Sequence, residues 1–486
     1  MSSGEITVVE EAKDSNSTKE KRSDLGTSNS NWSTRNNSHV EDAVFGHVGD
    51  KGPNYRSLSW IGTIALMTKT QVGLGVLAIP RTFHVLGLIP GVFCLVAIGG
   101  MTAWSNYMVG AFKLNHPEVY TIDDAGGKMF GRVGREIFAV IFMLNWVFIS
   151  ASAMLGISVG FNAVSTHALC TYVFVIIAAI ITFLLASIRT LSKIGWIAWV
   201  GIVCIMTAIF SVTIAVGVES KIPAAKAGNS TFKLTNNPSF SEAMAALSSH
   251  VFAYAGTPAY FSIIAEMRDP TLYTSALIWS QSIITAVYVV IGVVIYYYVG
   301  SNVASPALGS AGPIMKRVGF GFALPGLFVS AMIVTHVPAK YIFLRILRGS
   351  EHLHRNSLTH WGTWLGCTGG TTVIAYIIAS AIPQFDPLVS LVGASFGVFL
   401  CFQPFGCMWL YDNWGRKERG LRWKGMFAWS IFIIIIGTFL MIGGTYGSAE
   451  GISIARKTPS GSPWTCADNS NPAPKNLTSS NSTTTS

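Results

Sequence analysis

The chain has 486 residues, of which 50% are hydrophobic and only 12% are charged. A soluble domain carries about 25% charged residues, so this composition excludes an ordinary soluble protein and predicts a polytopic helical membrane protein. The net charge of +10 could indicate nucleic-acid binding. Because most of the excess lies in short loops between apolar segments, the basic character of cytoplasmic loops explains the charge better.

In chain order, the sequence begins with a polar tail, residues 1–56, which is rich in Ser, Asn and charge. We expect this tail to be cytoplasmic and disordered, with no cleavable signal peptide. Apolar runs then predict an all-α membrane domain over residues 57–447 with eleven transmembrane helices. The predicted spans are 58–80, 87–112, 135–164, 169–188, 194–218, 243–266, 273–300, 322–347, 360–381, 387–411 and 425–447. Residues 448–486 are predicted to form a tail rich in Ser, Thr and Asn.

The lysines and arginines of the loops set the predicted orientation. A cytoplasmic N-terminus places most of them in inner loops, as the positive-inside rule requires. An odd number of spans then puts the C-terminal tail outside the cell. Predicted glycosylation sites on that side are Asn229, Asn476 and Asn481. Cys170 and Cys466 could both face outward and pair, although we do not expect this pair, and the seven cysteines show no metal-ligand spacing.

The first span breaks the rules of a membrane helix. Gly73 and Gly75 each disfavour helix by about 1 kcal/mol relative to Ala, and Pro80 adds another breaker. Lys69 places a costly ammonium in the same apolar run. Broken backbone is tolerated at membrane depth where it lines a cavity. We therefore interpret this stretch as half of a solute-binding site.

The sixth span carries a second interruption, at the corresponding position of a five-plus-five arrangement. Gly256 and Pro258 fall in the middle of this span, next to polar residues. A matched pair of broken helices indicates an inverted-repeat transporter with a central binding site. The alternative is that both interruptions are kinks relieved by packing, since Gly and Pro are common in membrane helices.

The two breaks offer complementary backbone groups to a zwitterion. An unwound helix leaves amides and carbonyls without intrahelical partners, and amides at a helix N-terminus favour a carboxylate. We expect amides of the first break to bind a carboxylate and carbonyls of the second to bind an ammonium. The predicted substrate-binding residues are Thr70, Gly73, Leu74, Gly75, Asn145, Phe252, Tyr254 and Gly256. The aromatic residues could instead be packing residues, and Asn145 could bond a neighbouring helix.

Four side chains are candidates for ion coupling or gating. Lys69 could replace a bound metal cation or exchange a proton, or it could snorkel to the interface. His336 could relay protons or donate between helices. Thr335 could supply a hydroxyl oxygen to a cation site. Glu266 could act as a gate or form an ion pair at the end of its helix.

The sequence gives little support to metal or ATP chemistry. His352 and His354 lie in a basic loop, where the one nearby carboxylate, Glu351, does not complete a metal-ligand spacing and no Cys is close, and no Walker-type loop is present. A membrane transferase would need a catalytic acid or a His pair facing a cavity, which we cannot assemble. We expect no enzyme activity, no cofactor, no metal and no nucleic acid. The expected partners are a neutral amino acid, a proton and the lipid bilayer.

The broken spans resemble those of the amino acid/auxin permease family. The resemblance rests on Lys69-x-x-x-Gly73-x-Gly75-x-Leu77-x-x-Pro80, Phe252-x-Tyr254-x-Gly256, Glu266-Met-Arg-Asp-Pro270, and the tenth span from Val392 to Pro404. It covers roughly residues 57–447, and within the family the chain is most similar to fungal neutral amino acid permeases of the methyltryptophan-resistance type. This implies a leucine-transporter-like 5+5 inverted repeat of eleven helices, with discontinuous first and sixth helices.

The same resemblance implies proton-coupled uptake of neutral aliphatic and aromatic amino acids at the plasma membrane. Sodium-coupled members place an Asn ligand where Lys69 stands, whereas proton-assisted members carry Lys there. Thr335 falls where the sodium-coupled branch has a hydroxyl ligand. The alternatives are an amino acid sensor with minor transport and a vacuolar amino acid transporter.

Overall fold

In the computed structural model of this chain, the described residues are 41–42, 46–47, 58–188, 191–219, 232–347, 350, 357–416 and 419–470. The chain divides into two compact units, Met1–Gly52 and Pro53–Ser486. The described part of the first unit is an antiparallel pair of short strands, β1 (Glu41–Asp42) and β2 (Gly46–His47). The rest of the tail predicted to be disordered lies outside the described residues, as do Asn229, Asn476 and Asn481.

The second unit is helical. Its α-helices are α1 (Trp60–Gln71), α2 (Ile79–Leu86), α3 (Leu88–Asn115), α4 (Ile122–Ser165), α5 (Thr171–Ala186), α6 (Leu191–Glu219), α7 (Phe240–Ala253), α8 (Tyr260–Glu266), α9 (Tyr273–Val299), α10 (Pro313–Ile346), α11 (Leu358–Ala381), α12 (Phe385–Val392), α13 (Val398–Cys401), α14 (Gln403–Asn413) and α15 (Leu421–Ala455). Short 3₁₀ turns are η1 (Gly75–Leu77), η3 (Thr257–Ala259), η4 (Pro270–Leu272), η5 (Gly300–Asn302), η6 (Ala307–Ser310) and η9 (Pro459–Gly461). A π-helical turn, η8 (Gly393–Gly397), interrupts the tenth span.

The described residues include eight helices long and apolar enough to cross a membrane, or nine when α1 and α2 are counted as one bent span. This confirms the predicted class of a polytopic helical membrane protein. The predicted span 169–188 corresponds to α5, which has 16 residues. The predicted span 243–266 corresponds to α7 and α8 together. Each predicted span thus has a helical counterpart, while a total of eleven crossings stays a prediction.

The third span begins earlier than the apolar pattern indicates. α4 starts at Ile122, whereas the prediction started at residue 135. The carboxylate of Asp124 accepts a hydrogen bond from the Thr121 amide, at 3.3 Å, and so caps the first turn. The helix then kinks at Gly131, where φ is 69°. These first turns are polar, so hydrophobicity alone does not reveal them.

The last helix also extends past its predicted end at residue 447. α15 continues to Ala455, so residues 448–455 belong to the helix rather than to the predicted tail. Small residues bring α15 against α7: a Cβ added to Gly447 would lie 2.3 Å from the Ser241 carbonyl oxygen. This close backbone packing lies where the predicted span ended, and the helix continues beyond it to Ala455.

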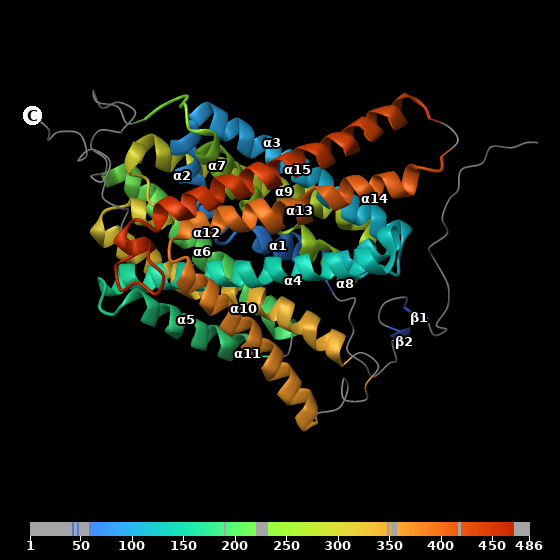
Figure 1. Cartoon of the computed structure of the whole chain (residues 1–486), viewed down its shortest axis with the longest axis horizontal. Coiled ribbons are helices and arrows are strands. Elements are labelled where there is room, and N and C mark those ends of the chain that lie inside the picture. Colours follow the sequence, from blue (N-terminus) through green and yellow to red (C-terminus); the bar gives the residue numbers. More distant parts are fainter. Residues whose placement is uncertain are drawn as a thin grey trace, which may run out of the picture. The chain divides into compact units, whose positions relative to one another are not determined.

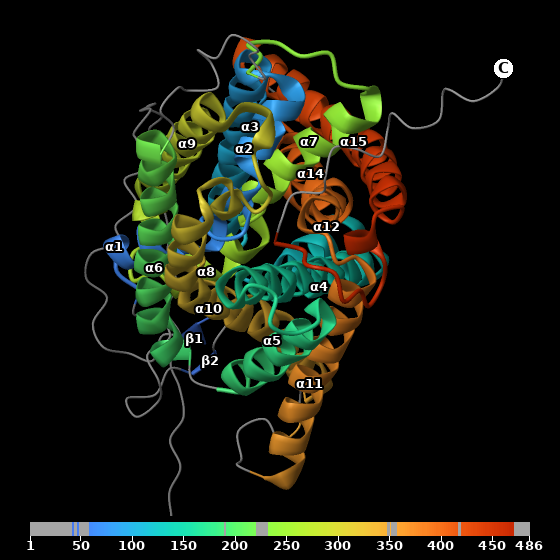
Figure 2. The same ribbon diagram turned by 90° about the vertical axis from the view of Figure 1, so that its left-hand side faces the viewer.

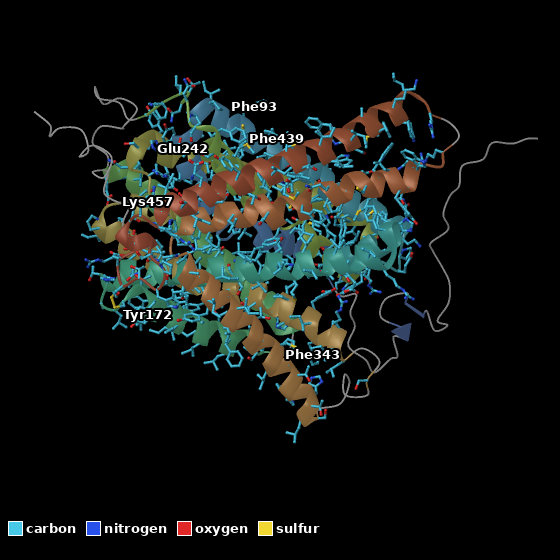
Figure 3. The ribbon with its side chains drawn as sticks, viewed as in Figure 1. Phe93, Tyr172, Glu242, Phe343, Phe439 and Lys457 are labelled. Carbon is cyan, nitrogen blue, oxygen red and sulfur yellow. A yellow bond between two sulfur atoms is a disulfide. The ribbon has the colours of Figure 1, made fainter. Side chains whose placement is uncertain are left out.

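The segment after α15 folds back onto neighbouring helix ends. Cys466 forms a disulfide with Cys170, at the start of α5. The pair lies near the labelled Tyr172 in Figure 3. The Trp464 amide donates to the Ser380 carbonyl at 2.9 Å, which ties the same segment to α11. The sequence allowed this disulfide without favouring it, because nothing local brings together two cysteines 296 residues apart.

Apolar side chains cover much of the outside of the helical unit. Phe93 of α3 is 72% exposed and Phe439 of α15 is 49% exposed, and Figure 3 shows both on the outer surface. Large exposed apolar surfaces mark contact with membrane or partners. Here they lie on helices of spanning length, so we interpret them as the lipid-facing surface.

The broken helices lie inside this helical unit. α1 packs against α9, and α7 packs against α2, α12 and α15. α10 packs against both α4 and α6. Figure 1 shows α14 and α15 running side by side. In Figure 2 α6 lies on one side of the unit and α15 on the other. The two breaks are thereby enclosed by helices rather than exposed to lipid.

Candidate functional site

The break in the first span leaves a run of amides without backbone partners. α1 ends at Gln71, and the two parts of the span are bent by 46°. The Val72 amide donates to the Thr68 carbonyl at 2.7 Å, and the next such bond runs from the Leu77 amide to Leu74, at 3.2 Å. Among the described residues, the amides of residues 73–76 make no backbone hydrogen bond. Four consecutive N–H groups are therefore available to an anion.

Gly75 brings the two breaks into direct contact. A Cβ added to it would lie 2.4 Å from the Cα of Ala253, a distance that no real side chain tolerates. The requirement for glycine at this position is thus steric. Ala253 is the last residue of α7, so the two unwound segments meet backbone to backbone.

The second break follows α7, which ends at Ala253, and leads through residues 254–256 into η3 and α8. Carbonyls of this stretch were predicted to bind an ammonium. Internal bonds occupy most of them, including one from the Ala255 amide to Phe252, at 3.1 Å, and one from the Gly256 amide to Tyr254, at 2.8 Å. Within the described segment, the Ala255 carbonyl accepts no backbone bond. It is the carbonyl best suited to receive an ammonium.

Tyr288 of α9 joins the two breaks, and it is not among the residues predicted from the sequence. Its hydroxyl lies 2.8 Å from the Gln71 carbonyl oxygen and 2.8 Å from the Ala253 carbonyl oxygen. The single hydroxyl proton can thus be shared between the last carbonyl oxygen of α1 and that of α7. The only sequence signal was a polar-tipped aromatic residue in a long apolar span, which is too common to interpret.

Gln71 makes a second link between the broken spans. Its Nε2 donates to the Tyr260 hydroxyl of α8 at 2.6 Å and to Oε1 of Gln281 at 3.4 Å. Gly256 lies directly against this side chain, because a Cβ there would meet Cγ of Gln71 at 2.9 Å. The same added Cβ would lie 3.0 Å from Oγ1 of Thr70, which itself donates to the Met67 carbonyl. Thr70 and Gly256, which were both predicted to bind the substrate, are therefore in contact.

Lys69 is buried and directed toward α10. It is 6% exposed, and its Nζ donates to Oγ of Ser330 at 2.7 Å. A Cβ added to Gly201 of α6 would lie 3.3 Å from Cε of Lys69, so the stem is enclosed as well. No carboxylate pairs with Lys69 in the part of the chain that the structure describes. The alternative of snorkelling to the interface is therefore wrong for this structure.

Hydroxyl groups of α4 and α10 pair between these two helices, and one of α10 also neighbours the first break. Thr335 lies one helical turn and a half beyond Ser330 on α10, and its Oγ1 lies 2.6 Å from Oγ of Ser150. A Cβ added to Gly73 would lie 3.6 Å from Oγ of Ser330. Ser330 thus neighbours both the lysine and the first break. Sequence reasoning missed it, since serine is unremarkable in a membrane helix.

Of the predicted apolar contacts, Leu74 faces α4 and Phe252 faces the tenth span. A Cβ on Gly156 would lie 3.0 Å from Cδ2 of Leu74. Likewise, a Cβ on Gly393 would lie 3.0 Å from Cβ of Phe252. Gly393 opens the π-turn η8, so a widened turn accommodates the end of α7.

Tyr254 has its side chain directed to α3 and α9. Its hydroxyl donates to Thr285 at 3.2 Å, and its ring packs at 5.2 Å from that of Tyr288. A Cβ on Gly99 would lie 2.8 Å from the Tyr254 hydroxyl. These contacts make the side chain a support for the second break, whereas only its backbone belongs to the break itself.

Asn145 on α4 is fully buried, and within the described residues neither of its side-chain amide atoms has a hydrogen-bond partner. The indole nitrogen of the adjacent Trp146 is also unpaired there. Buried polar atoms without partners are costly, and they are expected where a ligand completes the bonding. Within the described residues Asn145 therefore makes no bond to a neighbouring helix, and its role in substrate binding stays a prediction.

The remaining ionisable candidates lie toward the ends of their helices. His336 Nδ1 lies 3.2 Å from the Ala186 carbonyl oxygen, and its ring packs on Trp364 at 5.1 Å. Glu266 is the last residue of α8 and lies near Lys340 of α10, with which it forms no ion pair among the described side chains. The structure does not bring either of them to the breaks.

Backbone pairing also joins the starting end of the first span to the far end of the sixth. The Leu58 amide donates to the Glu266 carbonyl at 3.1 Å, and the Arg268 amide donates to the Leu58 carbonyl at 3.0 Å. At the opposite end, Nε of Arg81 lies 3.8 Å from Oδ2 of Asp386. The site is therefore held between contacts at both ends.

Comparison with known proteins gives consistent matches over most of the chain. A family model described as "Transmembrane amino acid transporter protein" matches residues 56–450. The chain is 35% identical over 429 residues to a "Transmembrane transporter" of Gibberella moniliformis, covering 86% of this chain and 89% of that protein. It is 32% identical over 436 residues to the "N amino acid transport system protein" of Neurospora crassa, covering 86% and 92%.

Among solved structures, MhsT in complex with L-phenylalanine is similar with a TM-score of 0.51. The match covers 80% of this chain and 98% of that chain, at 13% sequence identity. At this identity the likeness shows the fold alone. It confirms the predicted leucine-transporter-like architecture.

Proposed function

The chain belongs to the transmembrane amino acid transporter family, and from this premise we propose that it imports neutral amino acids by proton symport. The proposed substrates are aliphatic and aromatic amino acids. The proposed cycle is alternating access, in which the site between the broken spans opens to each side in turn. The proposed location is the plasma membrane, with the N-terminus cytoplasmic and the C-terminus extracellular.

The observation that carries this proposal is the run of unpartnered amides at residues 73–76, next to a second break that contains the Ala255 carbonyl. The amides are donors for a carboxylate, and the carbonyl is an acceptor for an ammonium. An α-amino acid carries both groups on the same carbon atom. The steric contact of Gly75 with Ala253 keeps the two segments close enough for one small ligand to reach both.

The proposed specificity for amino acids with neutral side chains is supported by the scarcity of charged residues at the breaks. Of the described side chains placed at the breaks, Lys69 alone is charged, and the others are apolar, hydroxyl or amide groups. A substrate with an acidic or basic side chain would need a partner of opposite charge when buried there. Leu74 and Phe252 provide apolar surface instead.

Proton coupling is supported by the surroundings of Lys69. Its ammonium has a hydroxyl partner, Ser330, and no carboxylate partner among the residues described. A buried amine in such a place supplies one positive charge beside the first break, as a bound cation would. Release of its proton on the cytoplasmic side removes that charge, which couples proton movement to substrate release.

Uptake into vesicles tests the proposal. The purified full chain, reconstituted in proteoliposomes, is expected to accumulate labelled leucine and phenylalanine when a proton gradient is imposed. Glutamate and lysine are expected not to compete. Accumulation that ignores the proton gradient or requires sodium would refute the coupling, and strong competition by charged amino acids would refute the specificity.

Substitutions at Lys69 test the coupling residue itself. Lys69→Asn and Lys69→Ala are expected to keep amino acid exchange between vesicle faces but to lose accumulation driven by the proton gradient. Lys128→Ala is the matched control, because Lys128 is exposed and paired with Glu118 at the protein surface. If both Lys69 variants accumulate substrate like this control, then Lys69 is a packing residue.

A further inference from the structure

A cleft of about 360 Å³ lies between the end of α14 and the start of α15, far in sequence from the broken spans. Figure 1 shows both of these helix ends at the same end of the bundle. The residues that line the cleft are Trp409, Asn413, Arg416, Gly420, Arg422, Trp423 and Met426. Its volume is at the lower end of the range for small-molecule sites, about 300–1,000 Å³.

One wall of the cleft is cationic. Arg416 and Arg422 both line it, and Arg419 of the same loop stacks its guanidinium 4.9 Å from the centre of the Trp423 ring. Among the described residues, none of the three arginines forms an ion pair. Two guanidiniums at one concave site form a strong receptor for phosphate, because each can donate two parallel hydrogen bonds.

A neighbouring carboxylate is already bonded elsewhere. Asp412 lies at the end of α14, where its Oδ2 accepts from Nδ2 of Asn115 at 2.9 Å and its Oδ1 lies 2.8 Å from Nε2 of His116. Both partners lie at the end of α3. Asp412 is thereby directed to α3, and it does not line the cleft.

The other wall is aromatic and apolar. Trp409 and Trp423 lie with ring centroids 6.0 Å apart, and Met426 lies beside them. The Trp423 indole nitrogen donates to the Asn413 carbonyl at 3.1 Å. This bond ties the Trp423 ring of α15 to the end of α14. A hydrocarbon chain can pack against this apolar wall, next to the cationic wall formed by the arginines.

The cleft also stands where these helices leave the apolar layer. Trp414, just after α14, is 62% exposed, and Leu421, the first residue of α15, is 88% exposed. Tryptophan is enriched at the membrane–water interface. A cationic cleft at this depth meets lipid headgroups before it meets soluble anions.

We propose that this cleft is a binding site for an anionic glycerophospholipid. The guanidiniums of Arg416 and Arg422 bind the phosphate, and the first carbons of an acyl chain lie on Trp409 and Met426. Basic pockets between membrane helices recognise anionic headgroups in this way. A lipid bound here joins the tenth and eleventh spans at their shared end.

Lipid binding to the full chain in an uncharged detergent tests the proposal. Native mass spectrometry and thermal unfolding are measured with phosphatidylglycerol, phosphatidylcholine and water-soluble glycerol 3-phosphate. Phosphatidylglycerol is expected to stay bound and to raise the unfolding temperature, whereas the other two have little effect. Equal effects of the two lipids would overturn the proposal. An equal effect of glycerol 3-phosphate would overturn it as well, because it would identify a site for soluble phosphates.

Variants locate the binding. The double variant Arg416→Gln, Arg422→Gln is expected to bind phosphatidylglycerol about tenfold more weakly or worse. Lys424→Gln is the control, since Lys424 is an exposed cation of the same helix that does not line the cleft. If the control loses as much affinity as the double variant, general surface charge explains the binding and the site is refuted.

Gly420 provides a test that keeps the arginines intact. A Cβ added there meets nothing within 4 Å, and its φ of −65° suits any residue. Because Gly420 precedes the first turn of α15, Asp or Ser at this position favours the helix. Gly420→Asp is expected to abolish the preference for phosphatidylglycerol by placing a carboxylate in the cleft, whereas Gly420→Ser keeps it. Equal lipid binding by these two variants would contradict the proposal.

Discussion

Removal of the Tyr288 hydroxyl tests how the two breaks are held. Tyr288→Phe deletes the donor 2.8 Å from the carbonyl oxygens of Gln71 and Ala253, and it keeps the ring packed against Tyr254. Tyr288 is completely buried, so water does not replace the lost donor. Leaving a buried acceptor unpaired costs about 1–3 kcal/mol.

The lost hydrogen bond is expected to disturb the arrangement of the two breaks, because Gln71 is the last residue of α1 and Ala253 is the last residue of α7. If the whole cost weakens the transport-competent arrangement, initial uptake falls by between about 5-fold and about 150-fold. The assay is uptake of labelled leucine into proteoliposomes, together with thermal unfolding of the same preparations.

The matched control is Tyr296→Phe on the same helix. Tyr296 accepts from the Lys233 amide at 3.0 Å and donates to the Lys233 carbonyl at 3.3 Å, so it bonds a loop away from both breaks. This variant is expected to lose stability without losing uptake. If Tyr288→Phe transports as fast as Tyr296→Phe, the Tyr288 hydroxyl does not set the geometry of the breaks, and the reasoning is wrong.

Two further substitutions probe close contacts on which the fold depends. Gly75→Ala is expected to abolish uptake, because its Cβ would lie 2.4 Å from the Ala253 backbone, whereas Gly100→Ala, with no atom within 4 Å, leaves uptake unchanged. Normal uptake by Gly75→Ala would show that the breaks separate easily. Cys466→Ser is expected to lower the free energy of unfolding by about 2–4 kcal/mol, and a reductant should lower the unfolding temperature of the unmodified protein in the same way. A reductant without effect would show that the disulfide does not stabilise the helical unit.

The amino-acid sequence alone determined where the two membrane helices break. Gly73, Gly75, Gly256 and Pro258 act on their own backbone, so their effect is local and can be read without neighbours. The interruptions in the structure fall at these positions. Membrane insertion is also a local matter of apolar run length, which is why every predicted span has a helical counterpart.

Helix ends and side-chain directions were less accessible to sequence reasoning. The polar first turns of α4 and the small-residue end of α15 lie outside the apolar runs, so the prediction stopped short of both. Tyr254 was assigned to the substrate from its position in the break, yet its hydroxyl reaches Thr285. An unwound segment has no fixed periodicity, and the direction of each side chain there depends on the helices around it.

Only the tertiary structure decided which groups serve the breaks. Lys69 meets Ser330, which is 261 residues away, and Tyr288 meets Gln71 across 217 residues. Such pairs depend on how the helices cross, and the sequence around a serine or tyrosine does not indicate which distant residue it will bond. The sequence therefore determined the positions of the unpartnered amides and of the buried charge, because both follow from local backbone chemistry and solvation. Packing determined the hydroxyl groups that hold them, because contacts between distant segments are fixed only when the helices come together.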